Sequence, residues 1–217
     1  MNKGFLSLCF VFLGLFYNAQ QDTTNIEKEA FKPPVPVELM VGNEALMFKM
    51  VVTKPINNSS FKFYNLLTFE SNFIESSASN IFTQTVVFYD LSSNFSLGLG
   101  GSYSSFSNLK PIAAVLYSSF NEHRGFLVQP SIVLEKNGAK ELFSMYEHSI
   151  HLSPKFKGYF RLDAFTSWQS SHSFSYLNTR IGVGTKIGNF GPAINVSFVG
   201  EDAIQFYNFG AFFNILI

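Results

Sequence analysis

Apolar and polar residues alternate with period two along most of the chain, in short segments bounded by Asn, Ser, Gly, Pro or Lys. The segment from Phe95 to Ser104 shows this most clearly, since Phe95, Leu97 and Leu99 share one face while serine and glycine occupy the other. Successive side chains of a strand point to opposite sides, so this pattern predicts strands with one apolar and one polar face. No stretch of useful length has the period of a helix.

The spacing of these segments predicts a chain of consecutive strands. Alternation is clear over residues 95–104, 126–135, 158–167, 175–187 and 192–199. It is weaker over residues 46–54, 60–70, 81–90, 111–120, 141–152 and 205–217. A closed antiparallel barrel of the bacterial type has an even number of strands. Val37–Val41 is the best further candidate and gives twelve strands, whereas merging two weak segments would give ten.

The connections between the segments are of two kinds. Tight turns are expected at Leu91–Asn94, Ser153–Lys155 and Gly188–Asn189, and longer polar loops at Asn72–Asn80, Gln169–Ser173 and Gly200–Ile204. In an up-and-down meander all the tight turns would fall at one end and all these loops at the other. Such an asymmetry is typical of outer-membrane barrels.

The polar faces favour a membrane barrel over a soluble β-sandwich. Charged residues make up 14% of the chain, against roughly 25% in an ordinary soluble domain, and Phe occurs 27 times. The polar faces consist mainly of Ser, Gly, Asn and Thr, which suit an enclosed lumen better than a solvated surface. In lipid a sheet must also close to pair its backbone groups. We therefore predict an all-β fold, an up-and-down antiparallel transmembrane β-barrel of 12 strands, with 10 possible and a soluble exported β-protein as the alternative.

The N-terminus is typical of a cleaved secretory signal peptide. Lys3 supplies the positive charge, Phe5–Phe16 the apolar stretch, and Ala19 a small residue near the cleavage site. The apolar stretch is shorter than the ~20 residues that a membrane-spanning helix needs. The expected organisation is a signal peptide over residues 1–20, a flexible segment over residues 21–36 and the barrel over residues 37–217.

Cys9 is the single cysteine of the chain and lies inside the predicted signal peptide. A lipid-modified cysteine would normally follow a small residue, but Leu8 precedes it. The mature chain is therefore expected to have no thiol, which excludes disulfides, cysteine nucleophiles and cysteine-ligated metals.

The C-terminus carries alternating apolar residues, namely Phe209, Ala211, Phe213, Ile215 and Ile217. Here the chain resembles the bacterial outer-membrane barrels, whose last strand carries such a signal for the barrel-assembly machinery. It departs from them at Ile217, where that family usually ends in Phe or Trp.

Two further stretches, Asn18-Ala19-Gln20 and Met40-Val41-Gly42-Asn43, together with the frequent Phe, resemble small uncharacterised outer-membrane barrels of the Bacteroidota. The resemblance implies an outer-membrane location, with membrane lipid and the assembly machinery as partners. It implies no particular activity.

A set of charged or amide side chains falls on the polar faces of the predicted strands and constitutes the candidate lumen site. Its members are Lys62, Glu70, Gln129, Glu135, Arg161, Asp163 and Arg180. They could line a narrow polar pore for small solutes. They could also pair with one another as a plug, which we favour, because unpaired charges inside a small barrel are costly.

Other functional classes have weaker support. An outer-membrane hydrolase of lipid or peptide could recruit Ser144, His148, Ser149, Asp163, Ser171 or His172, but no hydrolase motif surrounds them. The four histidines do not converge on a metal site, and the glycine clusters do not complete a nucleotide-binding loop. Formal charge is zero, so nucleic acid is an unlikely partner. We expect no enzyme activity and no cofactor.

Aromatic residues near the predicted strand ends are expected to form the girdles that contact the lipid headgroup region. They are Phe61, Phe63, Phe69, Phe88, Tyr103, Tyr117, Trp168, Tyr207 and Phe209.

Overall fold

A computed structural model describes residues 35–57, 59–73, 79–105, 107–169, 172–200 and 204–216. The predicted signal peptide and nearly all of the predicted flexible segment lie outside these residues. Within the part of the chain that the structure describes, no helix is long and apolar enough to cross a membrane.

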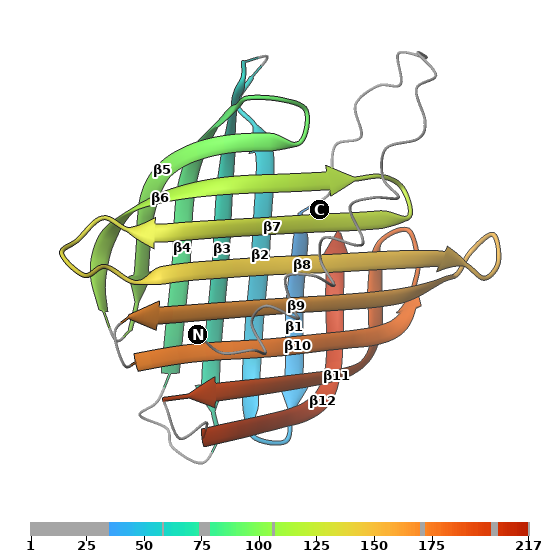
Figure 1. The fold of residues 1–217 in the computed structure, drawn as a ribbon. Coiled ribbons are helices and arrows are strands. Elements are labelled where there is room, and N and C mark those ends of the chain that lie inside the picture. The colour runs from blue at the N-terminus through green and yellow to red at the C-terminus, as the bar shows by residue number, and fades with distance from the viewer. Residues whose placement is uncertain are drawn as a thin grey trace, which may run out of the picture. The chain divides into compact units, whose positions relative to one another are not determined.

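In the described residues, twelve antiparallel strands form one closed barrel (Figure 1), which confirms the predicted fold and strand number. The strands are β1 (Pro36–Gly42), β2 (Ala45–Pro55), β3 (Phe61–Asn72), β4 (Ser79–Asp90), β5 (Phe95–Ser104), β6 (Ser107–Phe120), β7 (Arg124–Val133), β8 (Lys140–His151), β9 (Lys157–Gln169), β10 (His172–Gly184), β11 (Gly188–Val199) and β12 (Ile204–Leu216).

The barrel closes where the first strand meets the last. Strand β1 pairs with β2 on one side and with β12 on the other, from Pro36 opposite Leu216 to Gly42 opposite Gly210. All other strands pair with their neighbours in the sequence. Closure gives every strand two partners, so the sheet has no free edge that would expose backbone groups to lipid.

The connections fall at the two ends as predicted. The expected tight turns all lie at the end where β1 begins and β12 ends, here called the terminal end; the expected longer loops lie at the opposite, loop end. Two positions differ in detail. Gly188 and Asn189 belong to β11, so that turn falls at residues 185–187. The loop between β9 and β10 is short, because β9 extends to Gln169 and β10 begins at His172.

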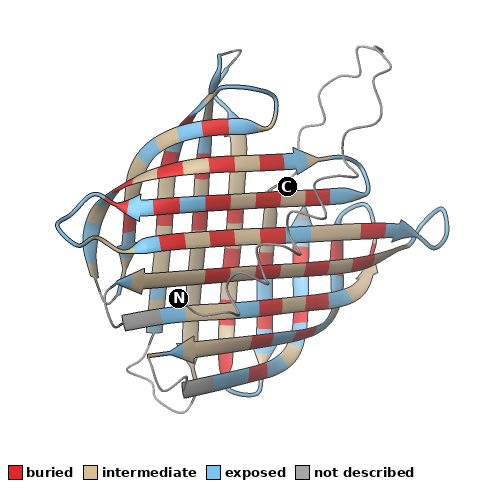
Figure 2. Ribbon diagram, viewed as in Figure 1, coloured by how far each residue is buried: buried red, intermediate tan, exposed pale blue. Residues whose placement is uncertain are grey.

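The apolar side chains of the clearly alternating segments point outward. Leu177 and Ile181 of β10 are 40% and 56% exposed, and Leu99 of β5 is 66% exposed. Figure 2 shows buried positions alternating with less buried ones along β7 and β8. The barrel thus has an apolar outer surface, which a soluble sandwich would hide between its sheets.

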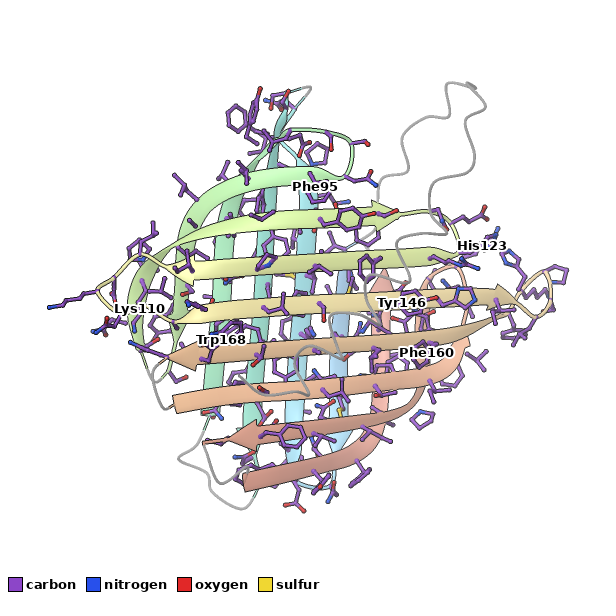
Figure 3. The ribbon with its side chains drawn as sticks, in the orientation of Figure 1. Phe95, Lys110, His123, Tyr146, Phe160 and Trp168 are labelled. Carbon is purple, nitrogen blue, oxygen red and sulfur yellow. The ribbon has the colours of Figure 1, made fainter. Side chains whose placement is uncertain are left out.

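Aromatic rings form contacts on the outer surface towards the terminal end. The ring centroids of Phe61 and Tyr89 are 5.3 Å apart, and those of Phe95 and Tyr117 are 4.9 Å apart. Figure 3 labels Phe95, which lies on the outer surface of β5. One predicted girdle residue was wrong: Phe88 points inward and is fully buried, because its position on β4 has the inward parity of Gln84 and Val86.

Candidate functional site

One half of the barrel interior is apolar. Its large side chains come from β2–β4 and β6–β9 and are almost completely buried. They include Tyr64, Leu66, Val86, Phe88, Ile112, Leu116, Leu127 and Phe143. Strand β5 contributes little bulk here: a Cβ at Gly98 would lie 2.6 Å from the Phe88 ring, so the glycine leaves room for that ring. Sequence analysis predicted a mainly polar interior, and for this half the prediction was wrong.

The other half of the interior is centred on Glu38 of β1. The Glu38 carboxylate accepts a hydrogen bond of 2.9 Å from Nε of Arg180 and another from Arg161. Arg180 also donates 2.7 Å to the side-chain oxygen of Asn195. Glu38, Arg161 and Arg180 have exposures of 1%, 2% and 0%, so these charges depend on one another for stabilisation instead of on water.

Asp163 extends this network towards the middle of the barrel. Its carboxylate accepts hydrogen bonds of 3.0 Å from Arg161 Nε and 3.0 Å from Asn178, and it forms an ion pair with Lys49. The Lys49 ammonium lies 5.1 Å from the ring centroid of Phe143 and 5.4 Å from that of Tyr176. Lys49 therefore joins the ionic half to the apolar half by cation–π contacts.

Glu147 of β8 is a third carboxylate near these cations. It stands directly opposite Arg161 in the β8–β9 register and accepts a hydrogen bond of 2.9 Å from the Tyr159 hydroxyl. Three cationic side chains, Lys49, Arg161 and Arg180, are thus matched by Glu38, Asp163 and Glu147. We call these six residues the ionic network. Its formal charge balances, which suits a cluster of which five members are buried and Glu147 is half-buried.

A smaller polar network lies within the apolar half. Gln84 donates 3.0 Å to the Glu141 carboxylate and 3.3 Å to the Ser131 hydroxyl, and it accepts a hydrogen bond from Gln129. These bonds join β4 to β7 and β8. They hold in place the buried carboxylate of Glu141, which would be costly without partners.

The interior is closed at mid-height. Side chains that point into the lumen from opposite walls, such as Arg180, Tyr64 and Phe143, have exposures of 0%, 0% and 1%. The lumen side chains of a water-filled channel would be in contact with water. The described part of the barrel therefore encloses a packed plug.

A cavity reaches into the barrel from the terminal end. A cavity of about 100 Å³ opens there, beside the turn between β6 and β7. Its charged and polar lining includes His123, Glu147, Ser149 and Lys157, while the buried side chains of Val51 and Met145 lie at its inner limit. This cavity, here called the vestibule, stops short of the ionic network's Lys49–Asp163 pair.

The structure separates the predicted lumen residues into two groups. Gln129, Arg161, Asp163 and Arg180 lie deep in the plug. The others lie towards the rims: Lys62 pairs with Asp90 at 2.8 Å, Glu70 is only partly buried, and Glu135 follows β7 and lies 3.7 Å from Lys110.

The alternating sequence pattern did not identify five further interior polar residues, namely Glu38, Lys49, Gln84, Glu141 and Glu147. Glu38 and Lys49 each stand as a single charge in an otherwise apolar segment. A lone charge in a membrane strand must face the interior, so this signal could have identified both.

The predicted C-terminal signal lies on β12. Phe209, Phe213 and Ile215 all point outward, with exposures between 42% and 51%. Ile217 lies outside the described residues.

The residues considered for hydrolysis do not come together. Ser144 and His148 point outward from β8, whereas Asp163 is held inside the barrel by Lys49 and Arg161. Ser149 faces the vestibule. Ser171 and the side chain of His172 are outside the described part of the chain. Among described residues, no group of three side chains could ligate a metal.

Several known structures are similar to this barrel at low sequence identity. No protein-family model and no curated protein matches the chain. The NanC porin is 10% identical, with a TM-score of 0.48, over 86% of this chain and 100% of that one. A KdgM porin in complex with disordered oligogalacturonate is 12% identical, with a TM-score of 0.46, over 84% and 98%. LpxR from Salmonella typhimurium is 5% identical, with a TM-score of 0.42, over 85% and 100%. These likenesses concern the barrel fold alone.

Proposed function

We propose that this chain is an outer-membrane barrel that is closed at rest and has a structural role, spanning the bilayer without conducting solutes. The observation that supports this function most directly is the full burial of charged and aromatic side chains that point into the lumen. Ions and solutes need a hydrated path, and the packed plug leaves none at mid-height.

The plug is held from several sides. The ion pairs of the ionic network connect β1 and β2 to β9 and β10, and the Gln84 network connects β4 to β7 and β8. None of these strands can therefore move without breaking hydrogen bonds, most of which involve a charged group and are stronger than neutral ones.

Planar-bilayer recording tests this function. We expect the refolded wild-type barrel to give no discrete conductance steps. A variant with Lys49, Phe143 and Tyr176 all changed to Ala removes the junction between the two interior halves and should conduct. The matched control is Leu99→Ala, which shortens an outward side chain and should stay silent. Steady conductance by the wild type at low voltage would overturn the proposal.

A gated pore for small solutes is the second candidate, and the vestibule favours it. The vestibule extends into the barrel from the terminal end and is lined there by Val51 and Met145. A gated pore should open in the wild type above a threshold voltage, and liposomes should then release a small solute. The structural function predicts silence at every voltage, so the same recording distinguishes the two.

Location and partners form part of the proposal. The outward apolar surface suits membrane lipid, and the alternating residues of β12 suit recognition by the barrel-assembly machinery of a Gram-negative bacterium of the Bacteroidota type. Changing Phe209 and Phe213 to Asn should reduce the amount of heat-modifiable barrel in the outer membrane. Mass spectrometry of the mature protein should show removal of the first ~20 residues as a signal peptide.

We propose no catalytic activity, and an assay can test this directly. The wild type, His148→Ala and His172→Ala should hydrolyse a chromogenic ester and labelled lipid A at the same background rate. A rate above background that one substitution abolishes would favour the hydrolase.

A further inference from the structure

A cluster of polar side chains lies on the outer surface of β3 and β4, where apolar residues are expected. Asn65 shares the outward parity of Phe61 and Phe63, and Thr83 and Thr85 share that of Val87. The side-chain nitrogen of Asn65 donates 3.1 Å to the Thr83 hydroxyl and 2.9 Å to the Thr85 hydroxyl. We call these three residues the outer polar cluster.

The cluster lies near the middle of the membrane-facing surface. On β3 the outward aromatic residues Phe61 and Phe69 stand four positions before and after Asn65. Four residues of a strand span about 13 Å, so Asn65 lies well away from either rim. Thr85 has the same central place on β4, between Ile81 and Tyr89.

The hydrogen-bonding capacity of the cluster is only partly used. Each threonine oxygen accepts from Asn65, which leaves its hydroxyl proton able to donate. The carboxamide oxygen of Asn65 has no hydrogen-bond partner among the described residues, although it can accept two bonds. Facing hydrocarbon, these groups would be desolvated without compensating hydrogen bonds.

Neighbouring positions in the same row of the outer surface have short side chains. Thr85 pairs in register with Gly101 of β5, and Gly101 pairs with Pro111 of β6. The row therefore continues from the polar cluster onto residues without long side chains, with the Leu109 side chain beside Gly101, where a Cβ would lie 3.0 Å from the Leu109 Cδ1 atom. In membranes, small and weakly polar residues are typical of protein–protein contacts, because they let backbones approach and hydrogen-bond.

We propose that a second copy of this chain docks on the outer polar cluster, in a two-fold symmetric dimer within the membrane. In such an interface each residue group meets its own equivalent, so the surface must be self-complementary. The cluster meets this condition: it is uncharged and offers both an acceptor, the Asn65 oxygen, and two hydroxyl donors. Asn65 of each copy accepts from a threonine of the other.

Single-cysteine cross-linking tests the contact. In a chain with Cys9 replaced by Ser, Thr85→Cys should form a disulfide-linked dimer in outer membranes on mild oxidation. The matched control is Thr179→Cys, because Thr179 is also an outward, half-buried threonine but lies on β10. We expect at least a tenfold difference in cross-linked fraction. Equal cross-linking of the two variants would indicate random collision and overturn the proposal.

Asn65→Leu tests the chemistry of the contact. The substitution places an apolar side chain towards lipid and should not impair the barrel, which heat-modifiable gel mobility checks. The dimer fraction, measured by energy transfer between labelled copies in liposomes, should fall at least tenfold. An unchanged dimer fraction, or a wild type that is monomeric at every protein-to-lipid ratio, would contradict the proposal. Neither result depends on whether the barrel conducts.

Discussion

The two halves of the barrel interior are closed by different means. In the apolar half, side chains such as Leu66, Phe88 and Leu127 pack against one another without needing particular partners. In the ionic half, Glu38 depends on Arg161 and Arg180, and Asp163 depends on Lys49 and Arg161. Apolar packing tolerates the exchange of one residue for another of similar volume. A buried charge that loses its partner instead destabilises the fold strongly.

The largest loss of stability should come from removing one carboxylate of the ionic half. Glu38→Ala leaves the guanidinium groups of Arg161 and Arg180 buried without their shared partner. We expect the free energy of unfolding to fall by about 3–5 kcal/mol. Equilibrium unfolding in urea from lipid vesicles measures it, followed by the fluorescence of the single Trp168. A loss below about 1 kcal/mol would mean that water reaches the arginines.

A cavity in the apolar half should lower the free energy of unfolding by slightly less. Phe88→Ala removes a fully buried ring that packs edge-on against Tyr64, with centroids 5.9 Å apart. We expect a loss of about 3 kcal/mol in the same titration. Phe88→Leu is the control and should cost clearly less, because it keeps most of the volume. If the two substitutions cost the same, packing does not stabilise this half.

Disrupting the Gln84 network should reduce stability by an intermediate amount. Gln84→Leu removes the amide that donates to Glu141 and Ser131, so a buried carboxylate loses one of its partners. We expect a loss of about 2 kcal/mol, since the cost comes from the carboxylate that remains. The double variant with Glu141→Leu should recover part of that stability. Additive losses in the double variant would show that the two side chains act independently.

A substitution on the outer surface should change the stability least. Leu99→Ala shortens a side chain that is 66% exposed, and lipid can fill the space that it leaves. We expect a change below about 1 kcal/mol. A loss as large as that of Phe88→Ala would show that Leu99 is packed against protein.

The local sequence pattern predicted the strands of the barrel better than the side chains that fill its interior. Strand β5 was predicted with its observed ends, because lipid selects Phe95, Leu97 and Leu99 on one face while the other needs only small residues. In β3 the alternation is weak because Tyr64 and Leu66 fill the interior while Phe63 and Leu67 lie outside. An apolar residue there does not indicate which side of the sheet it faces.

The ionic network was predicted only in part, for a related reason. Arg161, Asp163 and Arg180 were recognised because their strands alternate clearly. Their partners were not, because Glu38 and Arg180 are 142 residues apart in the chain and meet only across the lumen. The alternating pattern carries no information about which distant residues meet, so this pairing is visible only in the three-dimensional structure.

The junction between β1 and β12 has a consequence for biogenesis. The carboxylate of Glu38 leaves the ribosome early, and both of its guanidinium partners follow more than a hundred residues later. A truncated chain that stops before β9 would lack both guanidinium partners of the Glu38 carboxylate, and only Lys49, opposite it in the β1–β2 register, would remain beside it. We expect such fragments to insert less well than the full chain, because the closing strands and the two arginines that hold Glu38 are absent.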